Sequence, residues 1–345
     1  DDDYDVSDAD FTWDGSAQYD YEAQVVRNAG DFNDDGYDDI MVGSPSWDGS
    51  STAYNYYGRA YVIFGSASYS TSKTTLSDAD IIIEGTTRYD YMGGGLSGIG
   101  DIDGDSLPDL AIAAHGAASY AGQVHIFANG ISGILDATDA DTTMEGENRS
   151  NYCGNSQYTG HSVDTMGDIN NDGYSDVLIG CYYADGVQTQ SGASYIILGS
   201  SDILNSSAST YKSSYTLGKD EDITLEGEES YEYAGSVASY IGDSNGDGIT
   251  DLLIGAYYRK TKSASSNGAV YMMNGPIANG KYELDDDSNA LFWGSQSYAY
   301  YGSAAAPIGD FNDDGLEDFV IGAYFHDKGS YTSEGAAFMY LGRGW

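Results

Sequence analysis

Short apolar runs recur along the chain, and each follows directly on a cluster of acidic residues. The runs are IMVGS at 40–44, LAIAA at 110–114, VLIGC at 177–181, LLIGA at 252–256 and FVIGA at 319–323. Apolar runs this short, bounded by glycine or polar residues, are typical of buried β-strands rather than helices. No segment has a convincing helical period, so the pattern predicts an all-β protein.

Three more predicted strands accompany each run in a constant order. A tyrosine lies ten residues before each acidic cluster and opens the first strand of the unit. A glycine-led segment such as GRAYVIFG at 58–65 follows the apolar run, and a segment such as ADIIIEG at 79–85 comes last. The acidic clusters begin at positions 31, 101, 168, 243 and 310, which gives intervals of 70, 67, 75 and 67 residues. A four-stranded unit is therefore repeated five times.

Four-stranded units repeated along a chain are typical of the blades of a β-propeller. The sequence predicts a single domain of five blades, at 16–85, 86–146, 147–227, 228–294 and 295–345. The segment ADFTWDG at 9–15 matches a fourth strand but has no blade before it, whereas the chain stops after the third strand of the fifth unit. We therefore expect residues 9–15 to complete the last blade and to close the ring, which removes a free sheet edge. An open solenoid and a fragment of a larger propeller are the alternatives.

Composition excludes some classes of partner. The 13 Lys and Arg residues against 55 Asp and Glu give a formal net charge of −42. This balance excludes nucleic-acid binding through basic patches and disfavours anionic membrane surfaces. No apolar stretch is long enough to insert into a membrane. The sequence shows neither a signal peptide nor an initiator methionine, so we expect a mature or excised piece of a longer, exported chain.

The acidic clusters share one spacing of oxygen-bearing side chains. In DFNDDGYDD at 31–39, such side chains stand at positions 1, 3, 5 and 9 and glycine at position 6. Carboxylates this close repel one another unless a cation lies among them, and oxygen ligands in a flexible loop favour calcium. We predict about five structural Ca²⁺ ions, each bound by the four side chains and by the backbone carbonyl of position 7. The predicted ligands are Asp31, Asn33, Asp35, Tyr37 and Asp39; Asp101, Asp103, Asp105, Leu107 and Asp109; Asp168, Asn170, Asp172, Tyr174 and Asp176; Asp243, Asn245, Asp247, Ile249 and Asp251; and Asp310, Asn312, Asp314, Leu316 and Asp318.

Two details qualify this prediction. The second loop has Ser106 in place of the glycine, so we expect a strained turn there. An EF-hand begins with the same spacing but requires a glutamate at position 12 and a helix on either side. Position 12 is apolar in every loop, namely Val42, Ile112, Ile179, Ile254 and Ile321, so the EF-hand interpretation fails. A single loop of this kind could also be a solvated acidic turn; five copies favour calcium.

The repeated motif resembles a known family. The order Tyr/Phe-x-Gly, then G-D-x-N-x-D-G-x-x-D, then an apolar strand ending in I-G-A is similar to the FG-GAP repeat of integrin α-subunit propellers and their bacterial relatives. The resemblance implies a β-propeller that binds Ca²⁺ between the first two strands of a blade, at Asp31, Asn33, Asp35, Asp39 and their counterparts. The family typically has more and shorter blades, so integrin ligand recognition, which also depends on a partner subunit, is not carried over.

Aromatic residues follow the apolar runs and should gather at the end of the blades opposite the acidic loops. Such a surface suits stacking on sugars or anchoring of a protein, although aromatics can also simply cover hydrophobic blade ends. The candidate ligand-binding residues are Trp47, His115, Tyr182, Tyr183, Tyr257, Tyr258, Tyr324 and Phe325.

Two cysteines are expected on the same face. Cys153 and Cys181 either form a disulfide or remain two buried thiols.

The sequence lacks motifs for catalysis. Its four histidines share no motif, and neither G-x-S-x-G nor H-E-x-x-H occurs. His115, His161 and His326 are the remaining candidates for a catalytic base.

We therefore predict a non-enzymatic, extracellular or cell-surface binding module for adhesion or for recognition of a glycan or protein. It would bind no nucleic acid and would not insert into membranes. A self-assembling subunit of a surface filament or layer is the main alternative, and a polysaccharide-acting enzyme is the other.

Overall fold

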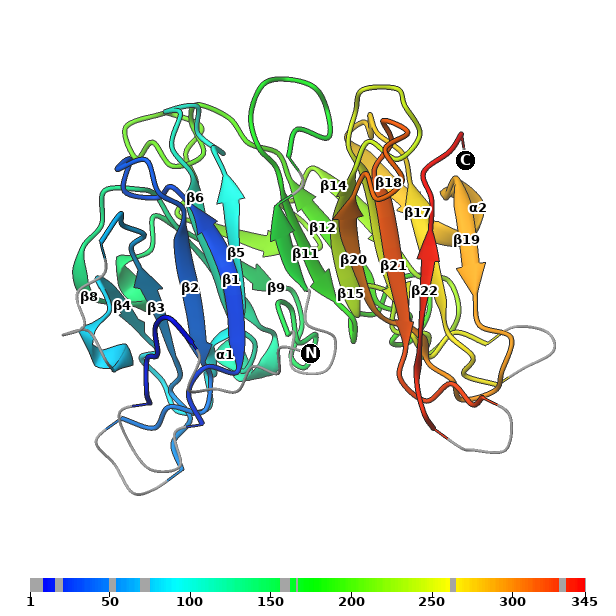
Figure 1. Ribbon diagram of the computed structural model, residues 1–345, viewed down its shortest axis with the longest axis horizontal. Helices are drawn as coiled ribbons and strands as arrows, with labels where there is room; N and C mark the ends of the chain where they lie inside the picture. The colour runs from blue at the N-terminus through cyan, green and yellow to red at the C-terminus, as the bar shows by residue number, and fades with distance from the viewer. Residues whose placement is uncertain are drawn as a thin grey trace.

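The chain folds into five β-sheets that stand side by side in an open arc (Figure 1). This computed structural model describes residues 9–15, 21–49, 54–68, 75–155, 162–165, 167–260, 265–328 and 333–344. Only short helical turns interrupt the strands there: α1 (Ala117–Tyr120), α2 (Leu284–Asp287), and two 3-10 turns at Leu76–Asp78 and Ala137–Asp139. The all-β prediction is confirmed. Within the described residues, none of these helices has the length and hydropathy that a membrane crossing needs.

Each sheet is built on three antiparallel strands that are consecutive in the chain, as the repeat predicts. The first strands are β1 (Val25–Gly30), β5 (Met92–Gly100), β10 (Val163–Thr165), β15 (Val237–Gly242) and β20 (Tyr301–Gly309). The second strands are β2 (Asp39–Ser44), β6 (Asp109–Ala114), β11 (Val177–Cys181), β16 (Asp251–Ala256) and β21 (Asp318–Ala323). The third strands are β3 (Arg59–Ile63), β7 (Gln123–Phe127), β12 (Ala193–Ile197), β17 (Ala269–Met273) and β22 (Ala336–Tyr340). Four sheets also have an antiparallel fourth strand: β4 (Ile81–Glu84), β9 (Thr142–Gly146), β14 (Ile223–Glu226) and β19 (Ala290–Trp293).

Three sheets have a fifth strand that the sequence pattern does not predict. These strands are β8 (Gly133–Asp136), β13 (Ser214–Leu217) and β18 (Gly280–Glu283). Each pairs in parallel with the fourth strand of the preceding repeat unit, namely β4, β9 and β14, respectively. β8 lies beside β4 at the outer edge of the first sheet in Figure 1. Each of these strands comes from the segment between the third and fourth strands of the following unit. Adjacent units therefore interlock, and a sheet is not identical with a repeat.

Hydrophobic clusters fill the spaces between consecutive sheets. Between the first two sheets, for example, Met41 and Val62 pack with Leu96 and Leu110. The second strands of the three middle sheets are buried on both faces, which explains why they are continuous apolar runs without polar alternation.

Glycine in the second strand allows neighbouring sheets to touch through their backbones. A Cβ atom on Gly43 would lie only 2.2 Å from the carbonyl oxygen of Gly93 in the next unit. The equivalent Gly180 would place a Cβ 2.1 Å from the carbonyl oxygen of Gly235. A larger side chain at either position would force the sheets apart, so these two glycines allow the close spacing of their sheets.

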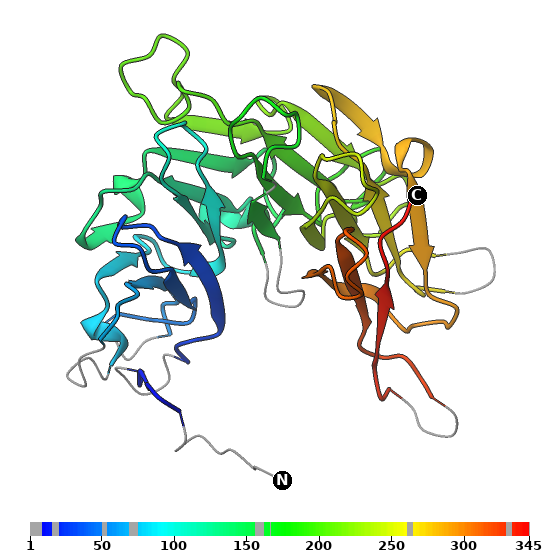
Figure 2. The same cartoon turned by 45° about the horizontal axis from the view of Figure 1, so that its top comes forward.

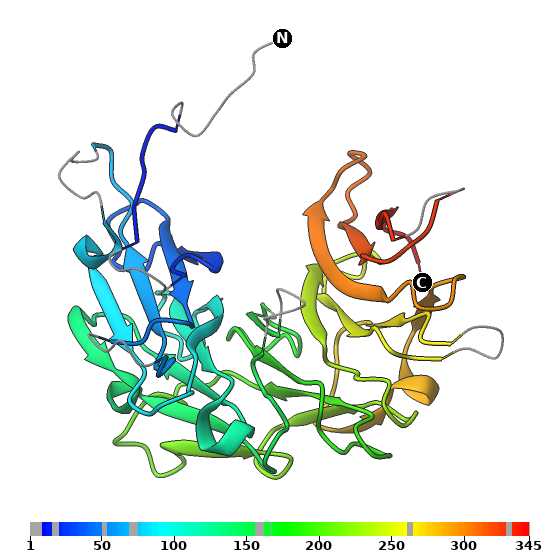
Figure 3. The same cartoon turned by 90° about the horizontal axis from the view of Figure 1, so that it is seen from below.

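The predicted closure of the ring by residues 9–15 is wrong in this structure. The first (blue) and last (red) sheets stand apart at the two ends of the arc, and the N-terminal segment lies at the first (Figures 2 and 3). Asp14 pairs in parallel with Thr75, and Trp13 packs against the cluster around Tyr61 and Ile82 on the outer face of the first sheet. Among the described residues, the fifth sheet contains only β20, β21 and β22. The segment does resemble a fourth strand, but the available apolar partners for Trp13 are on the first sheet.

A buried histidine should make the fold sensitive to acid. His125 lies in β7, is almost completely buried, and has its Nδ1 atom 3.1 Å from the hydroxyl of Thr143. Burial lowers the pKa of His125 to about 4 from its ordinary 6.5. Between these two pH values the unfolded chain binds a proton that the folded chain does not, so stability falls as the pH falls through this window, by about 3 kcal/mol in total.

This contribution can be isolated with His125→Gln. The difference in unfolding free energy between wild type and variant, measured by urea unfolding, should shrink as the pH is lowered from 7 to 4. Parallel stability curves across this range would contradict the assigned pKa shift.

Candidate functional site

The five acidic loops lie at one end of the sheets, where each joins a first strand to a second strand. They connect β1 to β2, β5 to β6, β10 to β11, β15 to β16 and β20 to β21. Because each loop lies between two strands, the structure agrees with the rejection of an EF-hand.

Hydrogen bonds within each loop turn its carboxylates inward. In the first loop, Asp31 accepts hydrogen bonds from the amides of Asp35 and Gly36, both at 2.9 Å. Asn33 Oδ1 also accepts from the amide of Asp35, at 3.1 Å, and Asp35 Oδ1 accepts from the amide of Tyr37 at 3.0 Å. The same four bonds recur in the other four loops. The backbone therefore fixes the side chains of positions 1, 3 and 5 around a common centre, where the carboxylates of positions 1 and 5 repel each other.

The aspartate at position 9 is buried in every loop. Asp176 accepts hydrogen bonds from the amide of Ile169 at 2.8 Å and from the amide of Gly199 at 2.9 Å, which joins the loop to the end of the third strand. Burial, together with the nearby loop carboxylates, raises the pKa of Asp176 to about 7 and that of Asp109 to about 8. A bound cation would favour the ionised form of these groups.

The second loop has the donor set best suited to a cation. Asp101, Asp103 and Asp109 each offer a carboxylate oxygen, and these oxygens lie within 4.8 Å of one another. Asp109 Oδ1 is buried and has no hydrogen-bond partner of normal geometry. An unsatisfied buried carboxylate oxygen is costly, and a hard cation would satisfy it. Ligation by the carbonyl of position 7 stays a prediction.

Strain in the second loop gives a direct test of its backbone. Ser106 has φ = 75°, in the left-handed region that Gly36 occupies with φ = 88° at the same position. Ser106→Gly should stabilise the protein by about 1 kcal/mol, because glycine adopts this conformation without a Cβ penalty. Urea unfolding measures the change, with Ser106→Ala as the control that keeps the penalty. Equal stability of the Gly and Ala variants would contradict this prediction.

Aromatic side chains gather at the opposite end of the sheets. The antiparallel pairs Met92–Ala114 and Tyr301–Ala323 place the start of each first strand beside the end of its second strand, away from the acidic loop. We call the aromatic cluster at this end the tyrosine surface. It consists of two groups of contacting rings: Tyr54, Tyr56, Tyr89, Tyr91 and His115; and Tyr120, Tyr152, Tyr182, Tyr183, Tyr233, Tyr257, Tyr258, Tyr300, Tyr324 and Phe325.

The tyrosine surface contains seven of the eight aromatic residues proposed from the sequence. The eighth, Trp47, instead packs under the guanidinium of Arg59, whose Cζ lies 3.6 Å from its ring centroid. Sequence reasoning missed several members, such as Tyr54, which precedes the third strand β3, and Tyr89, which precedes the first strand β5. The repeated Tyr-x-Tyr motif, at 54–56, 89–91, 231–233 and 298–300, is the signal that could have found them.

The histidines proposed as candidate bases do not form one site. His115 stacks on Tyr91 with ring centroids 4.9 Å apart, whereas His326 lies edge-on to Phe338 in the fifth unit. His161, like Tyr158 of the predicted third unit, lies outside the described residues.

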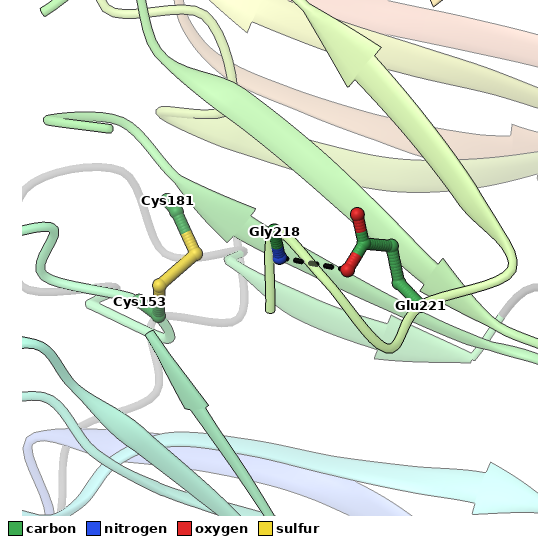
Figure 4. The surroundings of a disulfide bond; sticks show 4 residues. All are labelled: Cys153, Cys181, Gly218 and Glu221. Atoms are coloured by element: carbon green, nitrogen blue, oxygen red, sulfur yellow. Dashed lines mark hydrogen bonds between the residues drawn. A yellow bond between two sulfur atoms is a disulfide. The ribbon is translucent and has the colours of Figure 1, made fainter. Parts of the chain in front are cut away.

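The two cysteines are bonded beneath the tyrosine surface. A disulfide joins Cys153 to Cys181, with their Cα atoms 4.1 Å apart (Figure 4). Both residues are fully buried in the cluster between the second and third sheets. The turn after β13 lies nearby in the same view, where the amide of Gly218 donates to Glu221 at 2.7 Å.

Reduction of this bond should destabilise the protein. The cysteines are 28 residues apart, so the bond restricts the unfolded chain and contributes roughly 3 kcal/mol. A reducing agent should therefore lower the urea midpoint of wild type but not that of a Cys153→Ser, Cys181→Ser double variant. Identical wild-type midpoints with and without reductant would rule the contribution out.

Comparisons with known proteins identify the repeat. The model of a family described as FG-GAP repeat matches residues 28–63, 93–127, 159–197 and 234–273. "Integrin alpha pat-2" of Caenorhabditis elegans is 25% identical over 248 residues, which are 70% of this chain and 18% of that protein. Integrin alpha-IIb of Mus musculus is 36% identical over 124 residues, 34% of this chain and 11% of that protein. The chain thus spans less than a fifth of the length of these integrin α relatives.

Proposed function

Since this chain belongs to the FG-GAP repeat family, with integrin α chains among its relatives, we propose that it is a calcium-stabilised β-propeller module for adhesion or ligand recognition outside the cell. Each sheet is one blade. The five acidic loops hold about five structural Ca²⁺ ions at one end, and the tyrosine surface binds a glycan or protein ligand at the other.

The calcium proposal rests on the hydrogen-bond pattern that the five acidic loops share. The same backbone amides orient oxygen ligands in all five loops, and Asp109 has an unused oxygen in the loop with the most carboxylates. Calcium takes such oxygen ligands in loops, and its charge offsets their mutual repulsion. Each bound ion joins the first two strands of a blade through the loop between them.

The ligand proposal rests on the tyrosine surface, and binding measurements test it. Wild type and Tyr257→Ala are compared on an array of neutral and acidic glycans and on a panel of purified extracellular-matrix proteins, in the presence of Ca²⁺. We expect at least one ligand that wild type retains and Tyr257→Ala loses, because Tyr257 contacts both Tyr233 and Tyr300. The absence of any ligand that depends on Tyr257 would reject a recognition role for this surface.

A second candidate function is assembly with copies of the same chain. The free edge of β22 favours it, because Met339 and Leu341 are exposed beside backbone groups that have no strand partner in the described part of the fifth sheet. Size-exclusion chromatography with light scattering distinguishes the two functions. A monomer at all concentrations tested, with and without Ca²⁺, would exclude assembly.

A further inference from the structure

Many tyrosines of the tyrosine surface have left-handed backbone conformations. Positive φ angles occur at eight tyrosines of this surface, namely Tyr54, Tyr56, Tyr89, Tyr91, Tyr120, Tyr152, Tyr233 and Tyr300, and at three further described tyrosines, Tyr21, Tyr231 and Tyr298. Four pairs of them belong to Tyr-x-Tyr motifs, and the residue between the two tyrosines is buried each time: Asn55, Asp90, Glu232 and Ala299. The chain thus anchors the middle residue and turns both tyrosines toward the surface.

Packing does not explain the choice of tyrosine at the exposed ones among these positions. A left-handed conformation is unfavourable for a bulky residue, whereas glycine or asparagine adopts it readily. Tyr54 and Tyr89 are nevertheless 58% and 39% exposed, so much of each ring gains nothing from packing. Strained residues that gain little from packing point to a function for the side chain itself.

The second group of rings forms a continuous track across four sheets. Tyr152 lies 5.4 Å from Tyr183, Tyr183 lies 4.8 Å from Tyr233, and Tyr233 lies 5.3 Å from Tyr258, measured between ring centroids. The track continues from Tyr258 to Tyr300 at 5.1 Å and from Tyr300 to Tyr324 at 5.5 Å. A long row of contacting rings suits an extended polymer rather than a compact ligand.

The chemistry of the surface favours a neutral, hydroxyl-rich partner. The acids within the Tyr-x-Tyr motifs are buried, and Glu232 is paired with Arg259 at 3.0 Å. The chain's net charge of −42 repels polyanions. Tyrosine offers a ring face to the C–H side of a sugar and a hydroxyl to its polar groups.

A hydrogen-bonding cavity adjoins the first group of rings. His115 Nδ1 is buried without a hydrogen-bond partner and lines a cavity of about 80 Å³ together with Gln24, Ser46 and Tyr91. Buried polar atoms of this kind normally find a partner, and a sugar hydroxyl can supply one here.

We propose that the tyrosine surface binds a neutral polysaccharide along its length, and that its left-handed tyrosines are retained for this binding at the expense of folding stability. The inference rests on the proposed function and adds to it the class of ligand, its extended form and the stability cost. A surface that contacts several sugar units at once binds a longer oligosaccharide more tightly, because each added sugar unit contacts a further ring.

The test uses the full chain with Ca²⁺ and uncharged cello-, malto- and chito-oligosaccharides, from disaccharides to octasaccharides, by isothermal titration calorimetry. For at least one series, the octasaccharide should bind at least about tenfold more tightly than the disaccharide. The double variant Tyr54→Gly, Tyr89→Gly removes two exposed, left-handed members of the tyrosine surface. It should lose at least about tenfold in affinity for that octasaccharide while its melting temperature stays equal or rises. Asp34→Gly is the matched control at the opposite end, where Asp34 has φ = 58° and glycine occupies the same loop position at Gly104. It should gain stability with unchanged affinity.

Three results would overturn the inference: no binding of any neutral series, equal affinity for short and long chains, or a marked loss of stability in the tyrosine double variant. The proposed function fails on a different result, namely the absence of any glycan or protein ligand that depends on Tyr257. A module that bound only acidic glycans or a protein through Tyr257 would keep the proposed function and reject the neutral polysaccharide.

Discussion

Removal of calcium by excess EDTA should lower the melting temperature of the protein by about 20 °C. A site that is occupied at a large excess of ligand over its dissociation constant stabilises the folded state by about 2 kcal/mol, so five sites contribute on the order of 10 kcal/mol. For a domain of this size each kcal/mol shifts the melting temperature by roughly 2 °C. The physical reason lies in the loops, where backbone hydrogen bonds hold the carboxylates of Asp31 and Asp35 close together.

The measurement is differential scanning calorimetry in millimolar Ca²⁺, in excess EDTA, and after calcium is restored. Replacing Ca²⁺ by Mg²⁺ serves as the control for general screening of negative charge, because Mg²⁺ demands a smaller and more rigid site. An unchanged melt in EDTA would show that the loops are solvated acidic turns.

Replacing the buried aspartate of a loop should destabilise the protein even without metal. Asp176→Ala leaves the buried amides of Ile169 and Gly199 without their acceptor, and each such loss costs about 1–3 kcal/mol. We expect a total loss of about 4 kcal/mol in EDTA, with a further loss in Ca²⁺ because a ligand is also removed.

Asp172→Ala is the matched variant, because Asp172 belongs to the same loop but is exposed. It should unfold like wild type within about 1 kcal/mol in EDTA and should be destabilised only when Ca²⁺ is present. Urea unfolding of both variants under both conditions separates the structural hydrogen bonds from metal binding. Equal losses for the two variants in EDTA would contradict the distinct role of the buried residue.

The periodic part of the fold follows from the sequence because it depends on local pattern. The run at 177–181 becomes β11 with the same bounds, since five apolar residues between polar segments can be buried only as a strand. The acidic loops follow for the same reason, because their spacing places oxygen atoms on one side of a tight turn. These features can be predicted without knowing which distant segments of the chain come into contact.

The sequence could not predict those parts of the fold in which a segment could pair with more than one sheet. β8 has a largely exposed side chain in Ile134 and no apolar run, so only its docking onto β4 makes it a strand. Residues 9–15 have the pattern of a fourth strand, but the pattern does not say which sheet Trp13 will contact. The Tyr-x-Tyr motifs alternate like strands, and nothing in their spacing reveals the positive φ angles of Tyr231 and Tyr233.

The central claim is that all five acidic loops bind calcium, and anomalous X-ray diffraction tests it most directly. Crystals grown in millimolar Ca²⁺ should show one strong anomalous peak in each loop, coordinated by the side chains of positions 1, 3, 5 and 9. Loops that are ordered but contain only water at that calcium concentration would contradict the account.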